Sequence, residues 1–508
     1  MELHVTVSGR RDLAGQIYRQ LRDGIIDGRL AGGTRLPSTR DLALQLGVSR
    51  KTTLDVFERL LAEGYLNSRR GSGTFVADTL ERLPARERCH PRSHPRSRPD
   101  SQIRAATAAS IAARTAAPGE RAPRAVQATQ WWQAQARIDA LPRRDARLAC
   151  DFAGGITDKS RFPFDIWRRC INDALRVQAR GLGMYREPAG EEKLRLAVSR
   201  YLAFNRAVQS NWQDVIVTQG AQQALDLLAR VTLAPGDVVA VEDPGYPPAR
   251  DIFAALGAKV VPVPVDGEGL VVERLPKAAR LVYVTPSHQF PLGMPMCLER
   301  RVALLEWAQA RGALVIEDDY DCEYRFEGRS MEPLKSLDNA GLVAYVGTFS
   351  KTMFPELRVG YMVPPAELGG PLARARQIGD AHGCVLTQTA LAEFMLNGHF
   401  ARHLRRMHQT YAQRRDVLLG HLRGPLAPWL EAVTPNTAGL HLAARLVAPL
   451  DAATVAQAAH GASVGLHPLA PFHLEAPVQS GFLFGYGGVD AERIDAGLTS
   501  LAALLRSL

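Results

Sequence analysis

The sequence predicts a small α+β winged helix over residues 11–79 and a large α/β domain with a mainly parallel sheet over residues 150–508. Three observations predict this organisation. Short helical segments with apolar stripes, closed by glycines, fill the first range. Residues 80–149 are rich in Arg, Ala and Pro, with seven prolines, and are expected to be a linker because they can bury little apolar surface. From residue 150, runs of Val, Ile and Leu alternate with amphipathic helical segments, as in a parallel sheet covered on both faces.

The length and the charge distribution agree with this division. A chain of 508 residues exceeds one ordinary core and favours two or three domains. Residues 1–79 carry 12 Lys/Arg and 9 Asp/Glu, residues 80–149 carry 14 and 6, and residues 150–508 carry 36 and 37. The positive excess lies in the front part, as expected if only that part approaches DNA. A solvated basic linker would have the same composition, so charge alone leaves both explanations open.

The composition also indicates where the protein works. No stretch of about 18 apolar residues occurs, so no membrane span is expected. The first 11 residues lack the apolar segment of a secretion signal. The six cysteines are scattered without a CxxC pair, which is typical of reduced thiols. We therefore expect a cytoplasmic protein.

Two helices are predicted at the front of the winged helix. The first has an apolar residue at every fourth position, at Leu13, Ile17, Leu21 and Ile25. The second is expected to begin after Ser38, whose hydroxyl can cap it, while Asp41 favours the positive end of its dipole. Gly47 fits the left-handed position that ends it.

The third helix is expected to be the DNA-reading helix. Ser49 can cap it, and it is predicted to run to about Glu63, before Gly64. A turn of three or four residues between two short helices is the helix-turn-helix pattern. We expect Leu54, Phe57 and Leu61 to face inward. The start of the helix would then present to DNA the residues Ser49, Arg50, Thr52 and Thr53.

The segment YLNSRRGSGTFV alternates around two glycines and predicts a hairpin, with Arg69 and Arg70 at its tip, in reach of phosphate or the minor groove. Helix pairs in ordinary cores look much like a helix-turn-helix, so the pattern by itself is ambiguous. However, RLPSTRDLALQLGVSRKTTLDVFERLLAEGYL…GSGTFV resembles the GntR-type winged helix along its whole length. This resemblance implies binding to double-stranded operator DNA through Arg40, Arg50, Thr52, Gly71 and Gly73.

Four segments of the large domain match requirements of pyridoxal 5′-phosphate (PLP) chemistry. TFSKTMFPELRVG (348–360) resembles the Schiff-base segment of fold type I aminotransferases. The resemblance implies that Lys351 condenses with the PLP aldehyde, and burial would lower the pKa of its amine and keep it nucleophilic. Arg358 offers a planar fork to the phosphate and Thr348 a hydroxyl.

The other segments complete the expected cofactor site. In EDDYDCEY (317–324), Asp318 would pair with the pyridinium nitrogen and Tyr320 with the 3-oxygen. In QGAQQALDLL (219–228), a strand-to-helix turn presents amides to the phosphate, with Gly220, Ala221 and Gln222. The resemblance further implies that Tyr246 of EDPGY stacks on the pyridine ring. It also implies that Tyr185 reaches the phosphate held by a second copy of the chain.

Each segment has an ordinary explanation: a strand end, a common turn, or an acidic loop that is solvated or binds metal. Together, in this order and on an α/β pattern, they resemble about 340 residues of that fold, and we assign no metal site. A GntR-type reader followed by such a domain resembles the MocR group of bacterial regulators. Membership implies a head-to-tail homodimer in which PLP, or an amine bound to it, sets the affinity for DNA.

Two departures from the aminotransferase pattern affect what the domain can recognise. The usual NPTG loop is replaced by TPSHQFPLG, so His288 or Gln289 is expected to contact the 3-oxygen. Where such enzymes place an arginine that holds the substrate carboxylate, SGFLFGYGG is expected to place Phe482. Without that arginine two charge-assisted hydrogen bonds are lost, unless Arg250 or Arg445 substitutes.

Three functions follow as alternatives. The first is a regulator that senses PLP or an amine through Lys351, with little or no repeated transamination. The second is an active aminotransferase with a DNA-binding appendage, which the presence of Lys351, Asp318 and Tyr320 favours. The third is a DNA-binding protein whose large domain only dimerises, which the cofactor segments disfavour. At the end of the linker, Trp131 and Trp132 are expected to pack on a folded surface.

Overall fold

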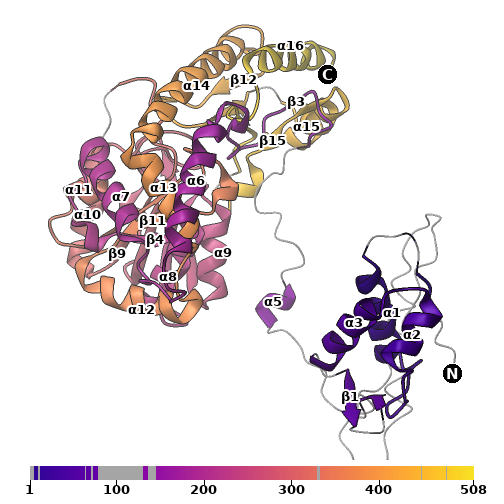
Figure 1. The fold of residues 1–508 in the computed structure, drawn as a ribbon. Helices are drawn as coiled ribbons and strands as arrows, with labels where there is room; N and C mark the ends of the chain where they lie inside the picture. The colour runs from indigo at the N-terminus through magenta and orange to yellow at the C-terminus, as the bar shows by residue number, and fades with distance from the viewer. Residues whose placement is uncertain are drawn as a thin grey trace, which may run out of the picture. The chain divides into compact units, whose positions relative to one another are not determined.

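The computed structural model describes residues 5–7, 9, 12–62, 65–69, 73–77, 130–134, 145–328, 332–447, 449–475 and 478–508. The chain divides into two compact units, residues 1–125 and 126–508, each of which is described by itself (Figure 1). Most of the predicted linker, together with Arg70 and Gly71 of the predicted hairpin tip, lies outside the described residues. In the part of the chain that is described, no helix has both the length and the apolar character to cross a membrane.

In the described residues of the N-terminal unit, three helices pack beside a two-stranded antiparallel hairpin. The elements are α1 (Leu13–Ile26), α2 (Thr39–Leu46), α3 (Arg50–Ala62), β1 (Leu66–Arg69) and β2 (Gly73–Val76). The predicted caps of α2 are confirmed. The Ser38 hydroxyl accepts the Asp41 amide at 3.2 Å, and Gly47 has a φ of 64°. Likewise, Ser49 accepts the Thr52 amide at 3.1 Å at the start of α3.

Helix α3 is rotated relative to the prediction. Its fully buried side chains are Thr53, Val56, Phe57 and Leu60, while Leu54 is 44% exposed. The expectation that Leu54 faces inward is therefore wrong. A helix buries positions three and four apart, and the set 53, 56, 57 and 60 matches the stripe that meets α1 and α2. Residue 54 lies about 100° away from residue 53, toward solvent.

The large unit is built on a mostly parallel sheet in the order β4-β11-β10-β9-β8-β5-β6-β7. Strand β11 runs antiparallel to both of its neighbours and β7 antiparallel to β6, while the other pairs are parallel. The strands are β4 (Ile216–Thr218), β5 (Val238–Asp243), β6 (Lys259–Asp266), β7 (Gly269–Leu270), β8 (Ala279–Val284), β9 (Leu314–Asp319), β10 (Val343–Thr348) and β11 (Gly360–Val363).

Helices cover both faces of this sheet. Within β9, Val315 packs into one core cluster with α10, and the next residue, Ile316, packs into another with α8, α9 and α12. Helices α6, α7 and α13 extend the first face. The helices are α6 (Phe164–Ala179), α7 (Glu192–Arg206), α8 (Ala221–Thr232), α9 (Pro247–Ala255), α10 (Leu298–Arg311), α11 (Leu334–Leu337), α12 (Gly369–Asp380) and α13 (Val385–Leu396).

The C-terminal part forms a second, smaller layer of strands with its own core. Its four-stranded sheet has the order β12-β13-β16-β15, and β3 pairs with β14 beside it. Its elements are β12 (Leu430–Ala432), β13 (His441–Leu446), β14 (Val464–Gly465), β15 (His467–Pro468), β16 (Gly481–Gly485), α14 (His399–Arg423), α15 (Ala452–Gly461) and α16 (Ala491–Ser507), with β3 (Cys150–Asp151) from the start of the unit.

Short elements complete the structure. They are α5 (Gln130–Ala134) and the 3-10 turns η2 (Lys159–Arg161), η3 (Trp212–Asp214), η4 (Val272–Arg274), η5 (Pro355–Leu357), η6 (Ala366–Leu368) and η7 (Ala470–Phe472). In α5 the two indole rings of Trp131 and Trp132 meet edge to face at 4.5 Å, and Trp132 is 54% exposed. The packing of these tryptophans on a folded surface stays a prediction.

This topology determines where a site can form. Strands β5, β8, β9 and β10 are parallel, so their carboxyl ends lie at one edge of the sheet. The segments that follow those ends carry Tyr246, Thr285, Tyr320 and Lys351. The small C-terminal sheet contributes β13 and β16 to the same cavity.

Candidate functional site

A cavity of about 280 Å³ opens at the carboxyl edge of the large sheet. Eight of the eleven residues that the sequence assigns to the cofactor line it: Ala221, Gln222, Tyr246, Asp318, Tyr320, Thr348, Lys351 and Arg358. They come from four separate segments of the chain. The structure therefore brings the segments together, and their roles in binding stay predictions. The other three, Gly220, His288 and Tyr185, do not line it.

Lys351 follows β10 and places its amine inside the cavity. The Nζ atom donates to the Gly155 carbonyl at 2.9 Å, and burial lowers the pKa of the amine. A side chain at Gly155, which has a φ of 79°, would meet Nζ at 2.7 Å. This glycine, which the sequence analysis missed, keeps the space beside the amine open.

Asp318 provides the clearest sign that the cavity is built for a ligand. Its Oδ2 atom accepts the Tyr283 hydroxyl at 2.8 Å, whereas its Oδ1 atom is buried without a hydrogen-bond partner. Burial raises the pKa of this carboxyl to about 7. A buried acceptor without a donor costs about 1–3 kcal/mol. The protonated ring nitrogen of PLP is a donor of the kind that Oδ1 lacks, so the residues present fit this cofactor.

The other end of the cofactor would be held by a helix N-terminus and an arginine. Gly220 precedes α8 with a φ of 83°, so Ala221 and Gln222 begin the helix with free amides. The Arg358 guanidinium lies next to this turn and donates to the Gln219 carbonyl at 2.8 Å. The backbone of Arg358 has a φ of 51°, a left-handed conformation that is strained for a residue other than glycine. Strained residues of this kind are found most often at ligand-binding and active sites.

Two hydroxyls stand beside this end. Thr348 donates to the Ser350 hydroxyl at 3.0 Å, and both residues line the cavity. Ser350 was not predicted, although its place directly before Lys351 in TFSKT was a usable signal. Amides at a helix start, a guanidinium and two hydroxyls together form an anion site that suits a phosphate.

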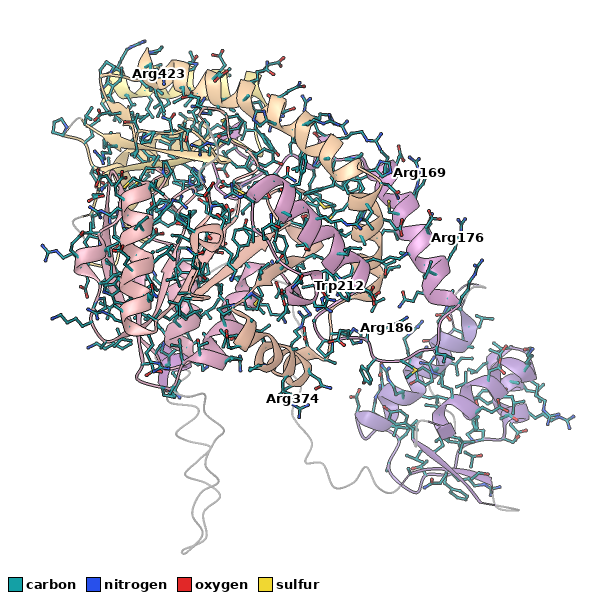
Figure 2. The ribbon with its side chains drawn as sticks, turned by 90° about the vertical axis from the view of Figure 1, so that its left-hand side faces the viewer. Arg169, Arg176, Arg186, Trp212, Arg374 and Arg423 are labelled. Atoms are coloured by element: carbon teal, nitrogen blue, oxygen red, sulfur yellow. The ribbon has the colours of Figure 1, made fainter. Side chains whose placement is uncertain are left out.

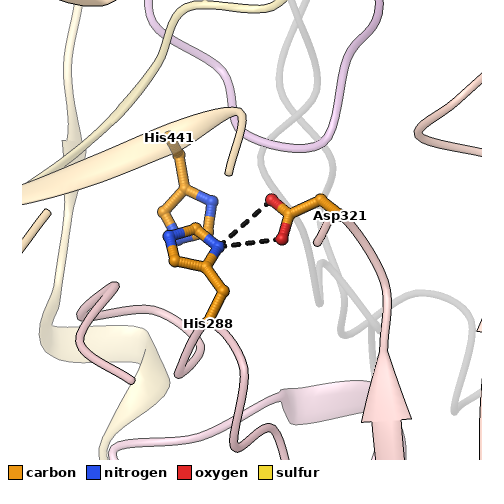
Figure 3. Close-up of side chains that lie close together, drawn as sticks. All are labelled: His288, Asp321 and His441. Carbon is orange, nitrogen blue, oxygen red and sulfur yellow. Dashed lines mark hydrogen bonds and ion pairs between the residues drawn. The ribbon is translucent and has the colours of Figure 1, made fainter. Parts of the chain in front are cut away.

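His288 and Asp321 form a buried pair, which Figure 3 shows together with His441. His288 Nδ1 lies 2.9 Å and 3.2 Å from the Asp321 carboxylate oxygens, and Tyr320 donates to the His288 carbonyl at 2.9 Å. Asp321 also accepts the Leu440 amide at 3.0 Å. Although burial opposes it, the His288 ring lowers the pKa of Asp321. Nδ1 of His288 is thus engaged with Asp321 and the residue does not line the cavity, so its contact with the 3-oxygen stays a prediction.

Gln289 does not replace it. Its amide nitrogen donates to the carbonyls of Pro244 and Phe290, at 2.9 Å and 2.7 Å, so it holds the loop in shape. The same loop contributes Thr285 and Phe290 to the cavity instead. Of the groups proposed for the 3-oxygen, Tyr320 alone lines the cavity.

The position expected for a carboxylate-holding arginine also needs correction. Phe482 is fully buried in the C-terminal core, with its ring 6.3 Å from that of Phe484. Successive side chains of a strand point to opposite faces, and in β16 it is Leu483 that lines the cavity. The prediction is therefore out by one residue. Leu483, and not Phe482, faces the cavity where the carboxylate-holding arginine was expected.

Neither proposed substitute arginine reaches the cavity. Arg250 donates to the carbonyls of Pro471 and Phe472, at 3.0 Å and 3.4 Å. Arg445 lies on β13 and is exposed. Both are outside the lining.

The predicted DNA-reading surface is formed by the starts of α2 and α3. Arg40, Ser49 and Arg50 are exposed and Thr52 is half-buried. Thr53 is fully buried, and its hydroxyl donates to the Thr39 carbonyl at 2.8 Å, so the expectation that it faces DNA is wrong. It joins α3 to α2 instead. Lys51, which was not predicted, is exposed in the first turn of α3.

The hairpin pairs as predicted, with Arg69 opposite Gly73. Gly73 has a φ of 112°, and an added side chain would lie 3.1 Å from the Arg35 guanidinium. Arg35 therefore lies beside the hairpin and is a further positive charge on this unit. Arg70 and Gly71 are outside the described residues.

Tyr185 lies on an exposed segment after α6. It is 86% exposed, and Leu182 and Met184 on the same segment are 81% and 69% exposed. Arginines at positions 169, 176 and 186 project from α6 and this segment in Figure 2. Exposed apolar side chains gathered in one segment are typical of an interaction surface.

Comparison with known proteins adds the family. The model for aminotransferase class I and II matches residues 155–473, and the model for bacterial regulatory proteins of the gntR family matches residues 13–76. The chain is 38% identical to the probable rhizopine catabolism regulatory protein MocR of Rhizobium meliloti over 494 residues, 97% of this chain and 94% of the relative. The chain is a MocR-type transcriptional regulator of the GntR family. Its GntR domain implies DNA binding.

This MocR-type chain has further relatives of both kinds. It is 29% identical to the pyridoxine biosynthesis transcriptional regulator PdxR of Corynebacterium glutamicum, over 94% of this chain and 93% of the relative. Its structure is similar to kynurenine aminotransferase of Pyrococcus horikoshii solved with PMP, with a TM-score of 0.66 and 28% identity over 75% of this chain and 95% of the other. The large domain is thus an aminotransferase class I and II domain, a kind that typically binds PLP.

Proposed function

We propose that this MocR-type regulator holds PLP on Lys351 and binds operator DNA in response to PLP itself or to an amine that exchanges with Lys351. The observation that carries the proposal is the Oδ1 atom of Asp318, buried without a partner in the cavity that contains the Lys351 amine. A domain used only for dimerisation has no need of such an atom. As a DNA-binding regulator the protein would act in the cytoplasm.

The residues divide the work of binding. Asp318 would hold the ring nitrogen, Tyr246 would cover the ring and Tyr320 would meet the 3-oxygen. The phosphate would be held by Arg358, Thr348, Ser350 and the amides of Ala221 and Gln222. When bound, the cofactor would supply an electrophilic carbon that can bond to an amine. Lys351 would provide the amine in the resting protein, and its Nζ would accept the protons of an incoming amine that replaces it.

Regulation is favoured over catalysis by the Leu483 side of the cavity. Repeated transamination requires a substrate held with its α-proton perpendicular to the ring, and positioning of this kind supplies roughly 7–11 kcal/mol in well-arranged reactions. Leu483 offers no charge to a carboxylate, so much of that positioning is lost. The second candidate, an active aminotransferase, is favoured by Lys351, Asp318 and Tyr320. We nevertheless expect this chain to show very slow or no multiple turnover.

We further propose a homodimer in which Tyr185 reaches the phosphate site of the second copy. The support is the high exposure of Tyr185 and of Leu182 and Met184 beside it. Apolar side chains as exposed as these gain most from burial in an interface, at about 25 cal/mol per Å² of apolar surface.

The DNA part of the proposal is tested by removing Arg50. Arg50→Ala should weaken specific binding to the DNA upstream of the gene by about 1–3 kcal/mol and relax the preference at one position of each half-site. Arg69→Ala should weaken binding to all sequences and reduce the salt dependence by about one unit of slope. Affinities of the full chain, measured by fluorescence anisotropy at several salt concentrations, decide this.

The matched control is Arg374→Ala, which removes an exposed arginine of α12 in the large unit (Figure 2). Its DNA affinity should equal that of the unchanged chain. Full operator affinity in both Arg50→Ala and Arg69→Ala would show that the DNA-reading surface lies elsewhere.

A further inference from the structure

We propose that the amine sensed by this regulator carries an apolar body and no carboxylate or other acidic group. This inference rests on the proposed function and specifies its effector. It comes from the wall of the cavity that the C-terminal part contributes. That wall consists of Leu440, His441, Phe472 and Leu483, and Phe290 of the neighbouring loop adjoins it.

The wall offers no positive charge to an acidic group. Among the described residues that line the cavity, the cationic side chains are Lys351 and Arg358. The proposed function engages the first with the cofactor aldehyde and the second with its phosphate. His441 does not add a third cation, because burial lowers the pKa of its imidazole to about 3 and leaves it neutral.

Arginines on α9 and α14, outside the lining, are held by the protein itself. Arg414 donates to the Gly487 carbonyl at 2.7 Å and pairs with Asp158. Arg415 donates to the Asn436 carbonyl and pairs with Glu327 at 2.6 Å. Arg250 is engaged by two carbonyls of η7, as described above. Moving any of them into the cavity would leave buried acceptors without donors.

The polar groups that do face the cavity also disfavour an anion. The Asp321 carboxylate lines it and would repel a second carboxylate. The Thr285 hydroxyl is already donated, to Glu242 at 2.6 Å, and the proposed function engages the Tyr320 hydroxyl with the cofactor's 3-oxygen. A carboxylate brought here would lose its water and gain no cationic partner among the described lining residues, which proteins avoid.

What the wall does suit is an apolar body. Two phenylalanines and two leucines line it, and burying apolar surface against them is favourable. The amine nitrogen would take the position of the Lys351 amine, where burial lowers the pKa of an amine and so favours its neutral, reactive form. The effector is therefore a primary amine of the alkyl or arylalkyl type.

Matched pairs that differ only in the carboxylate test this directly. The PLP-loaded full chain is titrated with 3-methylbutylamine and with leucine, and with 2-phenylethylamine and with phenylalanine, while the visible absorbance is followed. Each amine should bind at least about tenfold more tightly than its amino acid. Amino acids have the more acidic ammonium groups and so the larger free-amine fraction, which biases the comparison against the expected result.

A variant supplies the missing charge. Leu483→Arg should reverse the preference and strengthen the binding of leucine by about tenfold or more. The matched control, Val478→Arg, adds the same charge at a residue that is 61% exposed and outside the cavity, and should keep the preference for the amine. If Leu483→Arg does not fold, the pairs measured on the unchanged chain decide alone.

The outcomes separate this inference from the function on which it rests. Amino acids that bind as tightly as the amines would overturn the inference and leave amine sensing intact. A cation from a second copy of the chain that pairs with the carboxylate would produce this outcome. If borohydride fixes PLP to Lys351 but no probe of either class changes the spectrum, both amine sensing and this inference fail. Amines that bind more tightly and shift the operator affinity support both.

Discussion

A Lys351→Ala chain is expected to lose every reducible covalent link to PLP. The Nζ atom of Lys351 lies inside the cavity, and burial lowers the pKa of its amine, so a larger fraction is unprotonated and able to attack an aldehyde. The unchanged chain should be yellow, and borohydride should fix the cofactor to the peptide that contains residue 351. Visible absorbance and peptide mass spectrometry measure both.

Lys335 is an internal control for this labelling. Burial lowers the pKa of its amine too, but Nζ donates to the Val343 carbonyl at 2.7 Å, and the residue does not line the cavity. Its peptide should remain unmodified in both proteins. If Lys351 carries the cofactor, the Lys351→Ala chain cannot give the labelled peptide that the unchanged chain gives. An equally strong label on any other peptide would refute the assignment.

Asp318→Asn is expected to weaken the retention of PLP and, at the same time, to stabilise the protein without it. The bound pyridinium would lose its counter-charge, and breaking a buried pair in this way costs about 3–5 kcal/mol. Without cofactor the carboxylate is a buried charge whose pKa is raised to about 7 by burial. At pH 8 the folded chain must hold it ionised, so the amide should raise the free energy of unfolding by on the order of 1–3 kcal/mol.

The pH dependence follows from the same raised pKa. A folded-state pKa above the unfolded value means that the folded chain binds the proton more tightly. The resulting stability is therefore present below pH about 4 and is lost as the pH rises through about 7. In Asp318→Asn this part of the loss should disappear. Denaturant unfolding of the cofactor-free chains at pH values of about 4, 5.5 and 8 measures the loss across that window.

Asp165→Asn controls for the change in net charge, because Asp165 lies at the exposed start of α6 with 81% of its side chain exposed. It should change neither cofactor retention nor stability by more than about 0.5 kcal/mol. If Asp318→Asn retained PLP as well as the unchanged chain does, the pairing of Asp318 with the ring nitrogen would be wrong.

Motifs with local causes could be predicted from the sequence. Ser38 and Gly47 bound α2 because a hydroxyl cap and a left-handed glycine act within a few residues. The mostly parallel sheet followed from apolar runs, and the order of its strands then places Tyr246, Tyr320 and Lys351 at one edge. Chemistry carried by one residue at the end of one strand is visible in a sequence for this reason.

Features that depend on the rotation or register of an element could not be predicted. Thr53 and Leu54 exchange their expected sides because the orientation of α3 is set by packing on α1 and α2. Leu483 rather than Phe482 faces the cavity because one residue of register decides the face of a strand. His288 turns away to Asp321, which lies 33 residues along the chain. Gly155 reaches Lys351 from 196 residues away, with no local signal.

The central claim, that the aminotransferase-like domain controls DNA binding, is tested most directly by one measurement on a single preparation. The affinity of the full chain for the DNA upstream of its gene is determined without PLP, with PLP, and with PLP and each amine, beside an aminotransferase assay. The affinity is expected to change by about 1–3 kcal/mol with ligand occupancy, and DNA should change ligand affinity by the same factor, with little or no multiple turnover. Rapid turnover together with a DNA affinity that no ligand alters would contradict the account and identify the protein as an enzyme.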